Sequence, residues 1–176
     1  MSAERPTQGP DPVAGAAVPI RAHNLLCLQG FQGAGYDDVF TANMAQLHTR
    51  LLGAPETPIL VVRSPDHLCS ACPHLLRAEK GSRNHPGCGL GGKPHEAHMR
   101  RQDEIVSARL GARPGEIHLW HELLGLIANR IDPADLPSIC TTCPWLPLGV
   151  CAEGIVKLKR GMGLRKGARG IGRQEE

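Results

Sequence analysis

Two cysteine triplets dominate the chemistry available to this chain. They share a C-x-x-C-P core with a third cysteine further on, and they are Cys69, Cys72, Cys88 and Cys140, Cys143, Cys151. Two thiolates at this spacing can turn toward one metal ion or cluster, because the loop between them curls around it. Reduced cysteines that merely pack as small hydrophobic residues account poorly for two such triplets. The pattern therefore predicts metal binding, with a fourth ligand added to each triplet or one centre shared by both.

The identity of the metal depends on finer features of the motif. Iron–sulfur clusters and structural zinc both accept four thiolates. Zinc knuckles usually place Gly soon after the second cysteine, whereas both pairs here are followed directly by proline, Pro73 and Pro144, as in ferredoxin-type runs. The sequence thus favours an iron–sulfur cluster, [4Fe-4S] above other types, with zinc as the alternative.

The seventh cysteine has a histidine partner in sequence. His23 and Cys27 are four residues apart and would share one face of a helix. Three interpretations stay open: both residues ligate the metal, His23 activates Cys27 as a nucleophile, or Cys27 simply fills the core. Seven cysteines and His23 make eight ligands, enough for two four-coordinate centres.

Composition bears on the compartment and the partners of the protein. The first 18 residues lack the apolar segment of a secretory signal, and no apolar run is long enough to cross a membrane, so we expect a cytoplasmic protein with reduced thiols. Up to residue 156 the chain is nearly neutral, and its positive charge is concentrated in the C-terminal tail. That tail allows at most weak, nonspecific contact with nucleic acid, and a redox partner protein is the partner we expect.

The elements that must position these residues are mostly helical. Aromatic residues make up only 3% of the chain, so the core must be built from Leu, Ile, Val and Ala. We expect an unstructured segment 1–18, one cysteine-rich domain over 19–160 and a flexible basic tail over 161–176. The fold class predicted is a small α+β domain with a minor sheet and two cysteine-bearing loops, 64–94 and 136–151. Helices are predicted over 20–31, 37–52, 95–110, 119–131 and 152–159, and strands over 59–62 and 116–119.

Several of these motifs together resemble the family called Domain of Unknown Function 1284. The resemblance spans roughly residues 20–155 and is carried by RAHNLLCLQGF (21–31), GAGY (33–36), DHLCSACPH (66–74) and ICTTCPW (139–145) with Cys151. The family usually has a second histidine where this chain has Asn24, and a shorter insertion around Cys88. The resemblance implies an iron–sulfur protein without an established reaction.

Three functions follow as hypotheses. The first is an iron–sulfur protein in electron transfer or redox sensing. The second is a zinc-stabilised binding module. The third is a metalloenzyme that uses Cys27 or His23 beside an open metal position, although no carboxylate pair, triad or phosphate-binding loop supports a particular reaction.

Overall fold

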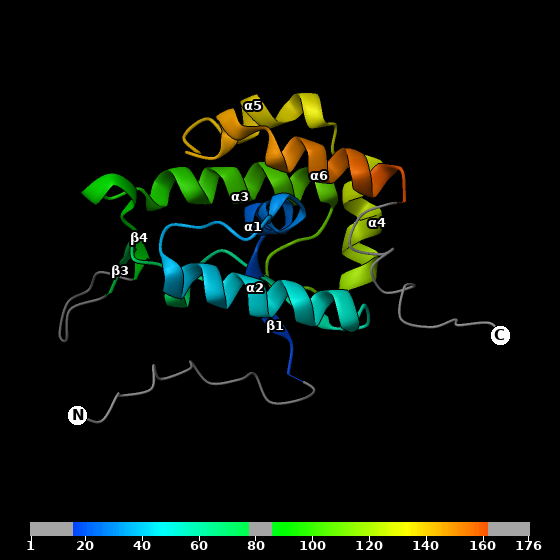
Figure 1. Ribbon diagram of the computed structural model, residues 1–176, viewed down its shortest axis with the longest axis horizontal. Coiled ribbons are helices and arrows are strands. Elements are labelled where there is room, and N and C mark those ends of the chain that lie inside the picture. The colour runs from blue at the N-terminus through cyan, green and yellow to red at the C-terminus, as the bar shows by residue number, and fades with distance from the viewer. Residues whose placement is uncertain (1–15, 78–85, 162–176) are drawn as a thin grey trace.

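The computed structural model describes residues 16–77 and 86–161 and confirms a small α+β domain (Figure 1). Most of the predicted unstructured start and nearly all of the basic tail lie outside the described residues. The helices are α1 (Ala22–Cys27), α2 (Asp38–Gly53), α3 (Glu96–Leu110), α4 (Trp120–Arg130), α5 (Leu136–Ile139) and α6 (Val150–Lys159). No helix among the described residues has the length and apolar character needed to cross a membrane.

A three-stranded sheet crosses the domain. Its order is β1 (Val18–Arg21), β2 (Pro58–Val62), β5 (Ile117–Leu119), with β1 parallel and β5 antiparallel to the central β2. Strands β2 and β5 confirm the two predicted strands. Strand β1 was not predicted.

The predicted helix over 20–31 is wrong at its start. Ile20 and Arg21 belong to β1, where Ile20 pairs with Val61 of β2. Helix α1 then runs only to Cys27 and continues as the 3₁₀ helix η1 (Leu28–Gly30). Pairing between segments far apart in sequence leaves no local periodic signal, so the apolar run looked helical.

Helix α2 follows its predicted pattern closely. The Asp37 carboxylate caps it by accepting a hydrogen bond from the Phe40 backbone N–H at 2.7 Å. The predicted stripe of Phe40, Met44, Leu47 and Leu51 is buried.

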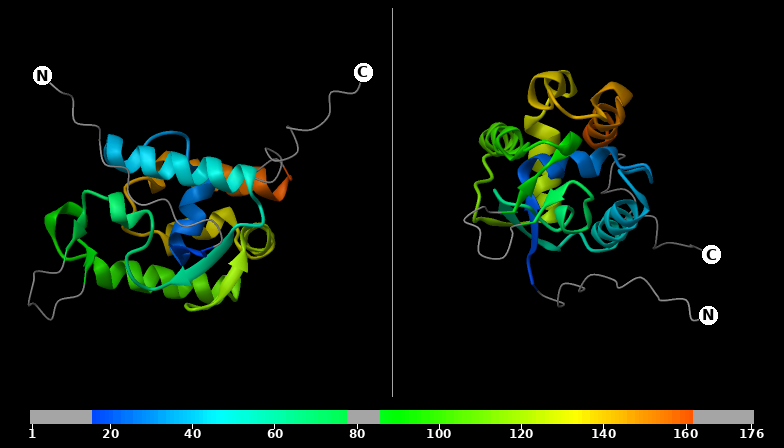
Figure 2. Two further views of the ribbon diagram at one scale, coloured as in Figure 1. Left: turned by 90° about the horizontal axis from the view of Figure 1, so that it is seen from below. Right: turned by 90° about the vertical axis from the view of Figure 1, so that its left-hand side faces the viewer.

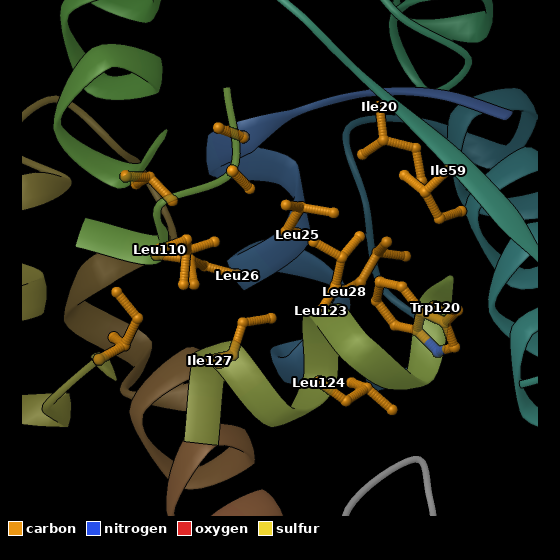
Figure 3. Packing of buried hydrophobic residues seen from close by; sticks show 14 of the residues in the cluster. Ile20, Leu25, Leu26, Leu28, Ile59, Leu110, Trp120, Leu123, Leu124 and Ile127 are labelled. Atoms are coloured by element: carbon orange, nitrogen blue, oxygen red, sulfur yellow. The ribbon is translucent and has the colours of Figure 1, made fainter. Parts of the chain in front are cut away.

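The core gathers around α1, which lies between α2 and α3 in Figure 1 and in the left view of Figure 2. Trp120 and Leu123 of α4 pack beside Leu28, with Ile20 and Ile59 of the sheet nearby (Figure 3). All five of these side chains are fully buried. Helix α1, which carries His23 and Cys27, is therefore held in a fully packed core.

The two predicted cysteine loops contain more structure than expected. The first holds the 3₁₀ helix η2 (Cys69–Ala71), a two-stranded sheet of β3 (Leu75–Leu76) and β4 (Gly87–Cys88), and the 3₁₀ helix η3 (Leu90–Gly92). The second begins with α5, which follows η4 (Pro133–Asp135) directly, and also holds η5 (Leu146–Leu148). Helix α6 begins at Val150, so Cys151 stands on its first turn rather than in a loop.

Candidate functional site

The cysteines come from widely separated elements and converge on two adjoining cavities. All seven are free thiols, Cys140 being buried and the others half-buried. The first cavity, of about 80 Å³, is lined by His23 and by five cysteines: Cys27, Cys69, Cys72, Cys88 and Cys143. The second, of about 140 Å³, is lined by four: Cys27, Cys140, Cys143 and Cys151. Cys27 and Cys143 border both, so the two predicted triplets and the predicted His23–Cys27 pair meet in one region.

Two glycines allow η1 and α6 to pack closely together beside the second cavity. Gly30 of η1 lies against Cys151, and a Cβ placed on it would stand 2.8 Å from the Cys151 Sγ. Gly154 of α6 lies on the η1 backbone, where an added Cβ would be 1.9 Å from the Gln29 carbonyl oxygen. Only residues without a side chain permit α6 and η1 to approach this closely, and their approach brings Cys151 to Cys27.

Burial makes these thiols reluctant to ionise on their own. Burial and the neighbouring cysteines raise the pKa of Cys151 to about 12 and that of Cys140 to about 11. Burial, followed by Cys151 and Cys143, raises the pKa of Cys27 well above its ordinary value. A nucleophilic cysteine needs a lowered pKa. These directions do not favour Cys27 as a nucleophile activated by His23, whereas a bound cation would offset the cost of ionising these thiols.

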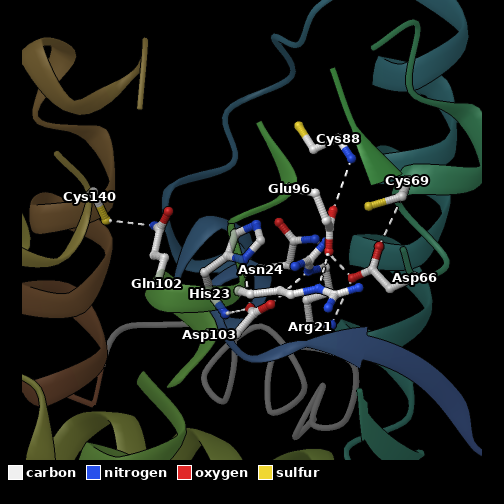
Figure 4. Close-up of polar contacts among 11 residues, drawn as sticks. Arg21, His23, Asn24, Asp66, Cys69, Cys88, Glu96, Gln102, Asp103 and Cys140 are labelled. Carbon is white, nitrogen blue, oxygen red and sulfur yellow. Dashed lines mark hydrogen bonds and ion pairs between the residues drawn. The ribbon is translucent and has the colours of Figure 1, made fainter. Parts of the chain in front are cut away.

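His23 pairs with an acid instead of with Cys27. Its Nδ1 lies 2.7 Å from Asp103 Oδ1, and its backbone N–H donates to the same oxygen at 3.1 Å. A carboxylate only accepts hydrogen bonds, so in the neutral imidazole Nδ1 carries the proton and Nε2 keeps the lone pair that could bind a metal. Figure 4 shows the ring between Cys140 on one side and Cys69 and Cys88 on the other.

Arg21 binds three carboxylates of the site at once. Its Nε donates to Asp103 at 2.7 Å, its Nη1 to Glu96 at 3.0 Å, and its backbone N–H to Asp66 at 2.8 Å (Figure 4). Burial alone raises the pKa of Asp103, but hydrogen bonds from His23 and the charge of Arg21 outweigh it and hold that pKa below its ordinary value. The same balance, with Arg21 as the main partner, lowers the pKa of Glu96.

Two of these carboxylates also fix the backbone of the first triplet. Asp66 Oδ1 accepts the N–H of Cys69 at 2.9 Å, and Glu96 Oε2 accepts the N–H of Cys88 at 2.9 Å. Arg21 therefore connects the segments that carry Cys69 and Cys88 to His23 of α1 through one network of hydrogen bonds.

A further donor and an aromatic wall complete the surroundings. Gln102 Nε2 donates to Cys140 Sγ at 3.2 Å. Tyr36 stacks on Trp145 with ring centroids 4.7 Å apart and meets the His74 ring edge-on at 4.6 Å. Tyr36, Phe40 and Trp145 all line the first cavity. In a chain so poor in aromatic residues, this concentration shields the cysteines from water.

The acids and amides of this network were missed at the sequence level. Gln102 and Asp103 lie on the buried face of α3 with Val106 and Leu110, in positions that a helix normally fills with apolar residues. Polar residues at core positions of a helix were the available signal. For Asp66 the signal was its place three residues before Cys69, which is typical of a side chain that caps a turn.

The donor set of the cavities suits a soft metal. Among the described residues neither cavity is lined by Asp or Glu, and their thiols and one imidazole are donors that select zinc, copper(I) or iron–sulfur clusters over magnesium or calcium. Across residues 16–77 and 86–161, however, no three His, Cys, Asp or Glu side chains are grouped tightly enough to hold one metal ion. The cysteines surround spaces rather than a point.

Comparison with known proteins gives one match. The model of a family described as "Protein of unknown function (DUF1284)" matches residues 35–149. The match contains Cys69, Cys72, Cys88, Cys140 and Cys143, while Cys151 and the segment with His23 and Cys27 lie outside it, so it is shorter than the resemblance noted in the sequence. No curated protein and no solved structure matches the chain.

Proposed function

We propose that this chain, which belongs to the DUF1284 family, is an iron–sulfur protein that carries electrons or senses redox state. One observation carries the proposal: all seven cysteines, free and drawn from separate elements, line two adjoining cavities that contain no carboxylate. The proposal includes a cytoplasmic location, where such thiols stay reduced, and a redox partner protein.

The number of thiols and the proline after each cysteine pair favour a cluster over zinc. Seven cysteines line the two cavities, and Pro73 and Pro144 directly follow Cys72 and Cys143, as in ferredoxin-type runs. Zinc bound by four of these thiolates is the alternative.

The surrounding residues suit electron transfer. A bound cluster supplies a site that gains and loses one electron. The wall of Tyr36, Phe40 and Trp145 excludes water from that site, which limits cluster hydrolysis and influences its potential. The N–H of Gln102 on the Cys140 sulfur stabilises the more negative, reduced state and so raises the potential.

The proposal is tested by metal analysis of protein purified without oxygen. We expect iron and acid-labile sulfide in equal amounts and a brown sample. Cys143→Ala should lower the content of both iron and sulfide, because Cys143 borders both cavities. The control Ser70→Ala, at an exposed position between Cys69 and Cys72, should retain them. A colourless protein with stoichiometric zinc, or unchanged iron in Cys143→Ala, would contradict the proposal.

A further inference from the structure

We infer that the cysteines form two unlike centres: one with four thiolates, Cys27, Cys140, Cys143 and Cys151, and one with three, Cys69, Cys72 and Cys88, completed by His23 Nε2. The inference rests on the proposed function and specifies where an electron would reside within it.

The lining of the two cavities determines this division. Of these two cavities, Cys140 and Cys151 line the second and not the first, and Cys69, Cys72 and Cys88 line the first and not the second. A four-coordinate centre in the second cavity therefore requires both residues that border the two, Cys27 and Cys143. The first cavity then keeps three cysteines and needs one more ligand.

Among the described residues, His23 is the one imidazole that lines the first cavity. The residue is 8% exposed, and Asp103, which is 1% exposed, fixes its Nδ1 and leaves Nε2 available. Proteins commonly orient metal-bound histidines by such a carboxylate. Arg21 on the other Asp103 oxygen keeps that carboxylate ionised and in place.

Unlike ligands give the centres unlike reduction potentials. A neutral imidazole in place of a thiolate removes one negative charge, which raises the potential, as in Rieske centres. An electron would therefore reside preferentially on the His23 centre, and Cys27 and Cys143, which border both cavities, lie between the two centres.

The test is a redox titration of the iron-loaded protein followed by electron paramagnetic resonance. We expect two reduction steps, and iron and sulfide sufficient for two clusters. Pulsed measurements on the unaltered protein labelled with ¹⁵N-histidine should show nitrogen coupling to the higher-potential centre. This measurement needs no variant and so does not depend on whether a substitution folds.

Variants then identify the histidine. His23→Cys should retain both clusters, lose the nitrogen coupling and lower only the higher potential. His98→Ala, which changes an exposed histidine on α3, should leave both steps unchanged. A single reduction step, no nitrogen coupling, or unchanged potentials in His23→Cys would overturn the inference while leaving the iron–sulfur proposal intact. Absence of iron and sulfide would instead remove the proposal itself.

Discussion

At the scale of single residues, Arg21 links the candidate site together. It is 1% exposed and reaches Asp103, Glu96 and Asp66, which in turn hold His23, Cys88 and Cys69. A buried charge destabilises the folded protein strongly unless its partners of opposite charge are present. The network therefore belongs both to the stability of the domain and to the arrangement of its ligands.

Replacement of Asp103 should cost stability. Asp103→Asn removes the main buried counter-charge of Arg21, and we expect the free energy of unfolding to fall by about 3 kcal/mol in urea titrations at pH 7. The matched control is Glu104→Gln on the same helix, because Glu104 is exposed and pairs only with exposed Arg63 at 3.8 Å. That control should change the free energy by less than about 0.5 kcal/mol. Equal effects of the two substitutions would show that the buried network does not stabilise the fold.

The same network predicts that the stability of the folded protein falls at acidic pH. Asp103 and Glu96 have folded-state pKa values below their ordinary values of 3.8 and 4.5. A lowered pKa contributes stability above the ordinary value, and that contribution is lost as the pH falls through the ordinary value toward the folded one. The metal-depleted protein should therefore lose stability below about pH 4.5, measured by urea unfolding at a series of pH values. In Asp103→Asn the loss should be smaller, and an equally steep loss would contradict the assignment.

At the scale of elements, the site depends on short segments packed at close range. The 3₁₀ helix η1 and helix α6 meet at Gly30 and Gly154, and this contact places Cys151 beside Cys27. Neither element has a long apolar stripe of its own. Their positions are set by contact with each other and with the core.

Addition of one methyl group at that contact tests its role. Gly154→Ala would place a Cβ 1.9 Å from the Gln29 carbonyl oxygen, so the backbone must shift, and we expect a loss of about 2–3 kcal/mol with reduced iron content. The control Gly125→Ala, inside α4, has no atom within 4 Å of the new Cβ. It should stabilise the protein by about 0.5–1 kcal/mol, as alanine does in a helix. Thermal unfolding and iron analysis of both variants measure these effects. Unchanged stability and iron content in Gly154→Ala would contradict the close contact.

The elements also show how far the sequence alone could predict the fold. Helix α2 was predictable because its cap and its apolar stripe are local. Strand β1 was not, because its pairing with β2 joins segments distant in sequence. The cysteines and His23 could be identified by residue type and spacing. Glu96 could not, since charged residues on a helix usually face solvent, and the signal for Asp103 was only its place on the apolar face with Val106 and Leu110.

At the scale of the whole molecule, the domain places its scarce aromatic residues at the cysteines. Tyr36, Phe40 and Trp145 line the first cavity, and apart from Phe40 and Trp120 the buried core relies on aliphatic side chains. Helix α1 extends from the core with His23 facing one cavity and Cys27 bordering both. This organisation fits a protein that encloses and shields a metal centre.

X-ray absorption on anaerobically purified protein tests most directly whether the cysteines bind an iron–sulfur cluster. We expect an iron edge, a first shell made mainly of sulfur, and a second shell from neighbouring iron atoms, which only a polynuclear cluster produces. A zinc edge without iron, or iron without an iron–iron shell, would contradict this expectation.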